Sequence, residues 1–369
     1  MNILATFRQR GKVWEYRIRE YNISKSGFKT KKEAKHAATE LEIELRRGNK
    51  IDTHSTVYDL WKRWYELEIL PSNKSKRTKE KYKKVGNQIE KYLGNEIASK
   101  LKYSDYQEIL NIYGENVGSD TLSRFNSAIR HSIVLAKKDL LTINDFTLGV
   151  KINAQKQAKK PNEKFIESIS DYQSILSYLK SVMNYPESIM PYFFYVQLKT
   201  GFRVGEVLAL TWNEINYEKK VISTYRRIDS ARHTFVPPKT DNSVRQVPVS
   251  DDVLNILLSL KEKQEAINIL KISDNLIFFD DKTGIPTNNG LNKALRKYLK
   301  ELEIQPIITA TGCRHTYCSV LLAKGIDIAV VAKFMGHKDT QRIIDTYGHV
   351  LKELEEKENE RIRTILQDF

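Results

Sequence analysis

The sequence lacks the features that would assign it to several common classes of protein. Its 369 residues include only two cysteines, Cys313 and Cys318, which are too few for a disulfide framework and lack the pattern of a four-ligand zinc site. No stretch approaches the roughly 18 apolar residues of a membrane span, and Met1 to Arg10 contains no apolar segment long enough for a secretory signal. We therefore expect reduced thiols, a cytoplasmic location and no membrane contact.

Several catalytic motifs are also missing. The seven histidines are dispersed, and none belongs to a His-Glu-x-x-His motif or a comparable ligand cluster. The sequence contains neither a G-x-x-x-x-G-K-[ST] phosphate loop nor a G-x-S-x-G serine elbow. These absences weigh against a metal site, ATP chemistry and a serine hydrolase, and no cofactor is expected.

Positive charge, by contrast, is abundant. The chain has 61 Lys and Arg against 46 Asp and Glu, and the resulting net charge of +15 favours a polyanion such as nucleic acid as partner. Hydrophobic residues make up 40% of the sequence and aromatic residues 10%, which is enough for packed cores. The length predicts two or three globular domains.

The first domain is expected at residues 1–50, as a small sheet followed by one helix. Apolar and charged residues alternate over the stretch from Trp14 to Ile18, which is the period of a half-buried strand, and a helical stripe of apolar residues follows Thr30. The outward strand face carries Arg17 and Arg19, and such a sheet can enter a DNA major groove. A solvated basic surface explains this segment equally well.

Residues 55–146 are predicted to form an all-helical domain, because apolar residues recur at helical spacing in four successive stretches. Between the first two helices lies the basic run PSNKSKRTKEKYKK, which could follow the phosphates of DNA or remain solvated surface. The candidate DNA-binding residues in this run are Lys76, Arg77, Lys79, Lys83 and Lys84.

The rest of the chain is predicted to comprise a linker and a larger domain. Residues 147–164 lack apolar periodicity and carry five lysines against one glutamate, as expected of an exposed basic linker. Residues 165–369 mix helices with a small antiparallel sheet, whose strands are expected from Val221 to Arg226, near Phe235 and from Val244 to Val249. The whole chain is therefore expected to be a multidomain α+β protein dominated by helices.

Five short fragments of the last domain could carry chemistry, and each is weak alone. They are Thr200–Glu206 (TGFRVGE), Lys239 beside a hairpin turn, Gly312–Thr316 (GCRHT), Met335–Lys338 (MGHK) and Asp345–His349 (DTYGH). In the first, Glu206 could brace Arg203 through an i,i+3 contact, although such a pair is more often a surface salt bridge. In their order and spacing the fragments resemble the tyrosine recombinase (phage integrase) family: T-G-x-R-x-x-E, a hairpin Lys, Arg-His-Thr, Gly-His and a Tyr ten residues after that His.

The resemblance is most specific over residues 165–350 and implies what each domain does. Residues 165–369 would be the catalytic domain, 55–146 a helical core-binding (SAM-like) domain, and 1–50 the arm-type DNA-binding domain of integrases from mobile elements. That N-terminal module favours an integrase over a chromosome-dimer resolvase. The implied partners are double-stranded DNA at attachment sites, a homo-tetramer assembled on it in a bacterial cytoplasm, and an accessory directionality factor or host DNA-bending protein.

For the site, the resemblance implies transesterification without a metal or ATP. Tyr347 would attack the scissile phosphodiester, forming a 3′-phosphotyrosine and releasing a 5′-hydroxyl. Arg203 and Arg314 would hold the non-bridging oxygens of the phosphate. Lys239 would protonate the leaving oxygen as general acid, and His337 would hydrogen-bond the phosphate.

One position departs from the family pattern. Thr311 stands three residues before Arg314, where the family usually has histidine, and a hydroxyl cannot accept and return a proton near neutral pH. His315 is a poor substitute, since one further helical residue turns its side chain about 100° from the face of Arg314, and a packing or supporting role is expected for it. We expect Thr311 to position the phosphate while another group or water takes the tyrosine proton.

The segment from His349 to Phe369 predicts a final helix, which would dock on a neighbouring protomer or pack on its own domain. Two other functions remain open. A non-catalytic DNA-binding or architectural protein would keep the fold, and Thr311 is its best support. A type IB topoisomerase-like enzyme would share the chemistry but relax DNA without partner exchange.

Overall fold

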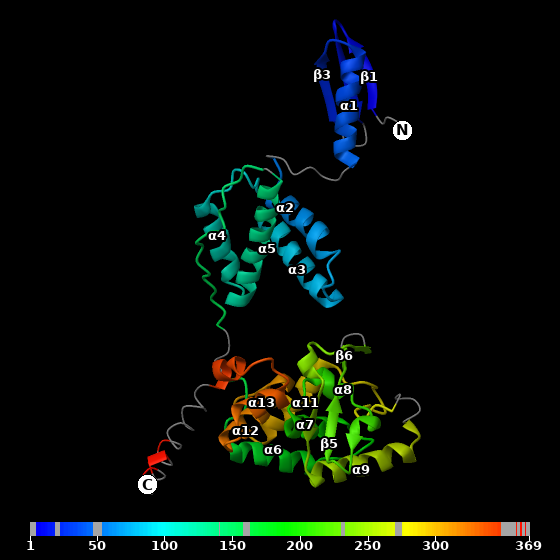
Figure 1. Ribbon diagram of the computed structural model, residues 1–369, viewed down its shortest axis with the longest axis vertical. Helices are drawn as coiled ribbons and strands as arrows, with labels where there is room; N and C mark the ends of the chain where they lie inside the picture. The colour runs from blue at the N-terminus through cyan, green and yellow to red at the C-terminus, as the bar shows by residue number, and fades with distance from the viewer. Residues whose placement is uncertain are drawn as a thin grey trace. The chain divides into compact units, whose positions relative to one another are not determined.

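The computed structural model divides into two units, residues 1–158 and 159–369, and Figure 1 shows their helices and strands. The described residues are 5–18, 23–46, 54–139, 141–157, 163–229, 233–269 and 275–347, with positions 359, 362, 363 and 366. Arg19 and nearly all of the predicted tail helix, 349–369, lie outside them. Among the described residues, no helix has both the length and the apolarity needed to cross a membrane.

The first unit begins with the predicted small sheet and helix. Its elements are β1 (Ala5–Arg10), β2 (Val13–Ile18), β3 (Ile23–Phe28) and α1 (Lys31–Arg46), and the strands are antiparallel in the order β1-β2-β3. Alternation along β2 buries Tyr16 and Ile18 in one core with Ala38 of α1, while Arg17 is exposed.

Four helices follow in the first unit, as the apolar spacing predicts. They are α2 (Val57–Trp64), which continues into the π-helical turn η2 (Tyr65–Ile69), α3 (Lys76–Leu93), α4 (Tyr103–Gly114) and α5 (Ser119–Lys138). Thr56 caps α2: its hydroxyl accepts from the Asp59 N–H at 3.1 Å, and its own N–H donates to the Asp59 carboxylate at 2.9 Å. The Trp61 ring packs directly over Gly86 of α3, where a Cβ would lie 1.9 Å from the ring, so this helix contact requires glycine.

The structure differs from the predicted linker at its start. Residues 147–157 run along α4, because the Gln107 side chain exchanges hydrogen bonds with the Lys151 backbone at 2.7 and 3.0 Å and the Gln155 N–H donates to the Gly114 carbonyl at 3.0 Å. Apolar periodicity reports regular elements only, so it could not reveal an extended segment held by its backbone.

The second unit is mainly helical, with two small antiparallel sheets. Its helices are α6 (Ile169–Ser181), α7 (Met190–Thr200), α8 (Val204–Leu208), α9 (Asp251–Ala266), α11 (Asn288–Glu301), α12 (Ala310–Ala323) and α13 (Ile328–Met335). One sheet has the order β4 (Ile215–Asn216), β5 (Val221–Thr224) and β8 (Arg245–Pro248), and the other pairs β6 (Arg227–Asp229) with β7 (Thr234–Val236). Helix α7 is buried along its length from Pro191 to Leu198, which makes it the centre of the main core.

The strands of this unit do not form the single sheet that the sequence predicts. Strand β5 ends at Thr224, and Phe235 of β7 pairs with Ile228 of β6 in a separate hairpin. Arg226 marks the break: its guanidinium bonds the buried Glu214 carboxylate at 3.1 Å and lies 4.3 Å from the centre of the Phe235 ring. The chain therefore leaves the β4-β5-β8 sheet after Thr224.

Candidate active site

Arg203 is presented by a sharp turn between α7 and α8. Gly201 ends α7 with φ +64°, and a Cβ there would lie 2.3 Å from an aromatic ring of α12, so the turn requires glycine. The Arg203 guanidinium donates to Glu206 Oε1 at 2.7 Å and to the Gly336 carbonyl at 3.3 Å. The i,i+3 pair expected from the sequence is present, and the arginine side chain keeps 28% exposure.

Glu206 is buried, and it binds a second arginine. Its side chain is 4% exposed and accepts from Arg245 Nη2 at 2.8 Å. Burial acts to raise the pKa of Glu206, but Arg245 and Arg203 outweigh burial and hold that pKa below its usual range. The fragment TGFRVGE, taken alone, favours a surface salt bridge. That interpretation is wrong, because Glu206 is buried and joins two guanidiniums inside the unit.

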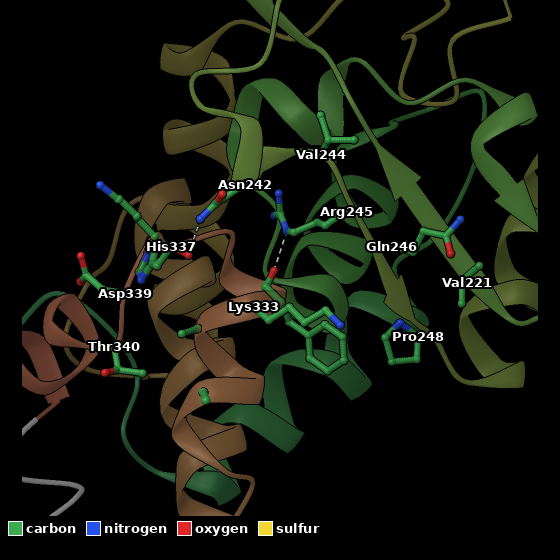
Figure 2. Close-up of a pocket in the computed structure, with 14 residues that line it drawn as sticks. Val221, Asn242, Val244, Arg245, Gln246, Pro248, Lys333, His337, Asp339 and Thr340 are labelled. Carbon is green, nitrogen blue, oxygen red and sulfur yellow. Dashed lines mark hydrogen bonds between the residues drawn. The ribbon is translucent and has the colours of Figure 1, made fainter.

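Arg245 is a candidate that sequence reasoning missed. It donates through Nε to the Phe334 carbonyl at 2.6 Å and through Nη1 to the Ser243 carbonyl at 3.0 Å, and it lies 4.9 Å from the centre of the Phe202 ring. Arg245 thus ties β8 to α8 through Glu206 and to α13 through the Phe334 carbonyl, a bond that Figure 2 shows. A signal was available, because Arg245 and Val247 are the buried positions of β8, where alternation predicts apolar residues.

Backbone carbonyls hold Arg314 in place. Its Nη1 donates to the Gly201 carbonyl at 2.7 Å and its Nη2 to the Met335 carbonyl, so the side chain joins α12 to the ends of α7 and α13. Burial, followed by the charge of Arg203, lowers the pKa of Arg314 to about 9. The guanidinium therefore stays charged at neutral pH and is oriented before any ligand binds.

His337 completes the group of cationic and imidazole side chains. It follows Gly336, which ends α13 with φ +60° and where a Cβ would lie 2.7 Å from the Asn242 carbonyl. His337 Nε2 lies 3.4 Å from Arg314 Nη2, whereas its buried Nδ1 has no hydrogen-bond partner within the described part of the chain. Burial, then Arg314 and Arg203, lower the pKa of His337 to about 4. The neutral ring accepts at Nε2, so Nδ1 carries the proton and can donate it to a ligand.

The predicted nucleophile lies in the same unit. Tyr347 is 1% exposed, its ring centre is 5.2 Å from that of Phe165, and its hydroxyl lies 2.7 Å from His315 Nδ1. Burial and the Cys318 thiol raise the pKa of Tyr347, while Arg314 acts to lower it. The rotation of His315 away from Arg314 brings its ring to the tyrosine, a contact consistent with the supporting role expected for it.

A pocket of about 770 Å³ lies beside these residues, between β8 and α13 (Figure 2). Asn242, Arg245 and His337 are among the side chains that line it. Over the described ranges, no three His, Cys, Asp or Glu side chains gather as they would around a metal ion. Oriented guanidiniums beside a neutral imidazole donor suit an oxyanion such as a phosphate group.

Comparison with known proteins decides the family. Residues 169–353 match the model described as the phage integrase family. The chain belongs to this family. A tyrosine recombinase XerC-like protein of Caldanaerobacter subterraneus subsp. tengcongensis is 23% identical over 88% of this integrase and 87% of its own length. The predicted family and recombinase function are confirmed.

Two solved structures share the fold of the integrase. The Tn1549 transposon integrase in complex with transposon right end DNA has a TM-score of 0.67 at 19% identity, over 84% of this chain and 100% of that one. A lambda integrase tetramer bound to a Holliday junction has a TM-score of 0.57 at 13% identity, over 92% and 97%. The predicted fold class is confirmed.

Two predicted site residues of the integrase make no described hydrogen bond to Arg203, Arg314 or Tyr347. Lys239 is exposed on the segment between β7 and β8, and Thr311 is exposed in the first turn of α12. The hydrogen bonds that the structure describes for Arg203, Arg314 and Tyr347 involve neither of them. Their roles remain predictions.

The predicted DNA-binding residues differ in how they are held. Lys79 donates from Nζ to the Leu70 carbonyl at 2.6 Å, which commits its ammonium to the connection between η2 and α3. The others that the structure describes are exposed: Arg17, Lys76, Arg77, Lys83 and Lys84. Exposed ammonium and guanidinium groups can follow DNA phosphates, so Lys79 is the weaker candidate.

Proposed function

We propose that this integrase cleaves and rejoins double-stranded DNA at specific sites to integrate and excise a mobile element. One observation carries the proposal. The hydroxyl of Tyr347, the guanidiniums of Arg203 and Arg314 and the imidazole of His337 come from four segments of one unit: both arginines donate to carbonyls at the end of α13, beside His337, and the charge of Arg314 acts on Tyr347. Such a group fits a phosphodiester, whose negative charge grows in the transition state.

The chemistry assigns a task to each of these groups. Tyr347 attacks the phosphorus and stays joined to the 3′ phosphate, which conserves the bond energy for rejoining. Arg203 and Arg314 stabilise the pentacoordinate transition state with little reorganisation, because carboxylate and carbonyl oxygens already orient them. His337 Nδ1 donates to a non-bridging oxygen, and Lys239 protonates the departing 5′ oxygen. Since Tyr347 is 1% exposed, the DNA phosphate can reach its hydroxyl only after the segments that cover it move aside.

The proposed partner is duplex DNA at attachment sites. Residues 1–50 would bind arm sites and residues 55–146 core sites, and the net charge of +15 supports both contacts. Assembly as a tetramer is proposed from the likeness to lambda integrase, which is described as a tetramer on a Holliday junction. We place this assembly in a bacterial cytoplasm, with a directionality factor or a DNA-bending protein as additional partners.

Cleavage of a suicide substrate tests the function. The substrate is a duplex attachment sequence nicked beside the cleavage position, so that the short 5′ fragment diffuses away and a covalent complex accumulates. The native chain should give a protein–DNA band that survives denaturing electrophoresis. Tyr347→Phe should give none while binding DNA as the native chain does, because it lacks only the nucleophile.

Three results would contradict the proposal. One is an adduct formed by Tyr347→Phe. Another is a native chain that binds attachment DNA without ever forming the adduct, as a non-catalytic DNA-binding protein would. The third is relaxation of a supercoiled plasmid in the absence of paired recombination sites, which would indicate an enzyme of the type IB topoisomerase kind.

A further inference from the structure

Two adjacent residues of α12 bind different partners. Arg314 donates to carbonyls at the ends of α7 and α13, whereas His315 directs Nδ1 to the Tyr347 hydroxyl at 2.7 Å. The divergence follows from the rotation of about 100° between successive residues of a helix. His315 therefore places a ring nitrogen in contact with the group that must lose a proton before or during attack.

The other titratable groups of the site are unsuited to take the tyrosine proton. Burial raises the pKa of Cys318 to about 12, so its thiol is already protonated at neutral pH. His337 lies against Arg314 through Nε2 and carries its proton on Nδ1. Arg314 and Lys164, whose charges act on His315, are cations with no lone pair to offer.

We propose that His315 accepts the proton of Tyr347 during DNA cleavage, in place of a residue at position 311. The inference rests on the function proposed above. The Oη–H bond of Tyr347 breaks and its proton passes to His315 Nδ1, while the Oη electron pair forms the new bond to phosphorus. The bond from phosphorus to the 5′ oxygen breaks, and that oxygen takes a proton from Lys239. Rejoining reverses each transfer and returns the proton to Tyr347.

Bound DNA makes His315 a better base. In the free protein, burial followed by Arg314 and Lys164 lowers the pKa of His315 to about 4, so the ring is neutral and Nδ1 can accept a hydrogen bond from the hydroxyl. The scissile phosphate brings a negative charge to Arg314 and offsets the repulsion from that cation. The imidazolium that forms in the reaction is therefore less unfavourable with substrate in place.

The test compares the native chain with His315→Asn in single-turnover cleavage of the suicide substrate at saturating DNA. The asparagine amide can keep a hydrogen bond to Tyr347 but cannot take its proton at neutral pH. We expect cleavage to slow by roughly 10²–10⁴, the usual contribution of general acid–base catalysis, while DNA affinity stays near the native value. His233→Asn, at the exposed turn between β6 and β7, is the matched control and should cleave at the native rate.

A rescue separates proton transfer from a structural role. Thr311→His, added to His315→Asn, restores an imidazole one helical turn from Arg314, and cleavage should recover by about tenfold or more. If neither this change nor added imidazole speeds up His315→Asn, the histidine is only structural and the proposal is overturned. Native-rate cleavage by His315→Asn overturns it as well. So does a gain of about tenfold from Thr311→His in the native chain, because it would show that no proton acceptor was present. Failure of the native chain to form the adduct contradicts the proposed function instead.

Discussion

Positive charge is arranged differently in the two units of the molecule. In the second unit, Arg203, Arg245 and Arg314 are fixed, because carboxylate or carbonyl oxygens bind each guanidinium. In the first unit, Lys83 and Lys84 are exposed on one side of α3. Fixed cations suit a single phosphate whose charge changes during a reaction, whereas exposed cations suit a duplex backbone in any register.

The fixed arrangement depends on one buried carboxylate. Glu206 pairs with both Arg203 and Arg245, while Arg314 has carbonyl and imidazole partners but no carboxylate among the contacts that the structure describes. Buried charges are costly unless they are paired and hydrogen-bonded. Three guanidiniums around a single carboxylate leave a local surplus of positive charge, and that surplus is what a phosphate would neutralise.

Removing the Arg245 guanidinium from the group of fixed cations should have the largest effect on stability. Arg245→Met keeps the length of the side chain but leaves Glu206 buried with one partner fewer, and losing one partner of a buried pair costs about 3–5 kcal/mol. Thermal unfolding of the second unit, followed in the full chain, should therefore shift to lower temperature. Gln246→Met, at the neighbouring exposed position of β8, is the control and should leave the unfolding temperature unchanged. If Arg245→Met and the native chain unfold at the same temperature, the fixed cations of the second unit do not differ in stabilising role from the exposed cations of the first.

The pH dependence of stability tests the same pairing of Glu206 with Arg245. The folded pKa of Glu206 lies below its ordinary value of 4.5, so its ion pairs contribute stability that is complete above that value and is lost as the pH falls through the folded pKa. The difference in unfolding temperature between the native chain and Arg245→Met should therefore shrink as the pH falls from neutral toward about 3. A difference that stays constant over this range would mean that Arg245 stabilises the unit by packing alone.

Arg245 also marks a limit of what the sequence could predict. The order and spacing of short motifs were enough to predict the family, and they also predict the set that includes Arg203, Arg314 and Tyr347. The pairing of Arg245 with Glu206 spans 39 residues and depends on how β8 packs against α8, for which no local pattern exists. An arginine at a buried position of a strand was the one available signal.

His315 shows a second limit. Helical geometry correctly turns its side chain away from Arg314, but its partner Tyr347 comes 32 residues later, so the contact could not be derived from the helix alone. The segment 147–157 was missed for a different reason. It is held through backbone hydrogen bonds, which leave no periodicity in the sequence.

The exposed cations of the first unit should matter only when DNA is present. Replacing Lys83 and Lys84 by alanine together should change stability by no more than about 0.5 kcal/mol. If each contacts a phosphate, the slope of log affinity against log salt concentration should fall by about 2, as fluorescence anisotropy with attachment DNA can measure. Lys79→Ala is the matched control, because that lysine lies on the same helix but is bound to the Leu70 carbonyl. A loss of about half that slope in Lys79→Ala, which removes one charge against two, would show that total charge, not position, governs binding.

The β1–β2–β3 sheet combines features of both arrangements, because its charges are exposed yet organised around one carboxylate. Glu15 Oε1 accepts from Ser24 Oγ at 2.6 Å, and Oε2 lies 3.0 Å from Arg10 Nε. The hydrogen bond from Ser24 lowers the pKa of Glu15, and the charges of Arg10, Arg8 and Arg17 act in the same direction. The carboxylate therefore stays ionised in the middle of a basic face.

Of these changes, Glu15→Gln should have the smallest effect. It should raise affinity for DNA, whereas the loss of Lys83 and Lys84 should weaken binding. The change removes a negative charge from the face expected to meet DNA, so affinity for random duplex at low salt should rise a few-fold. Discrimination between arm sites and random DNA should narrow, because Arg10 loses the carboxylate that holds its guanidinium in one position. Glu40→Gln removes the same charge from an exposed position of α1 and should leave discrimination intact. If both variants raise affinity equally and neither alters discrimination, the sheet attracts DNA through net charge alone, as the exposed lysines of α3 do.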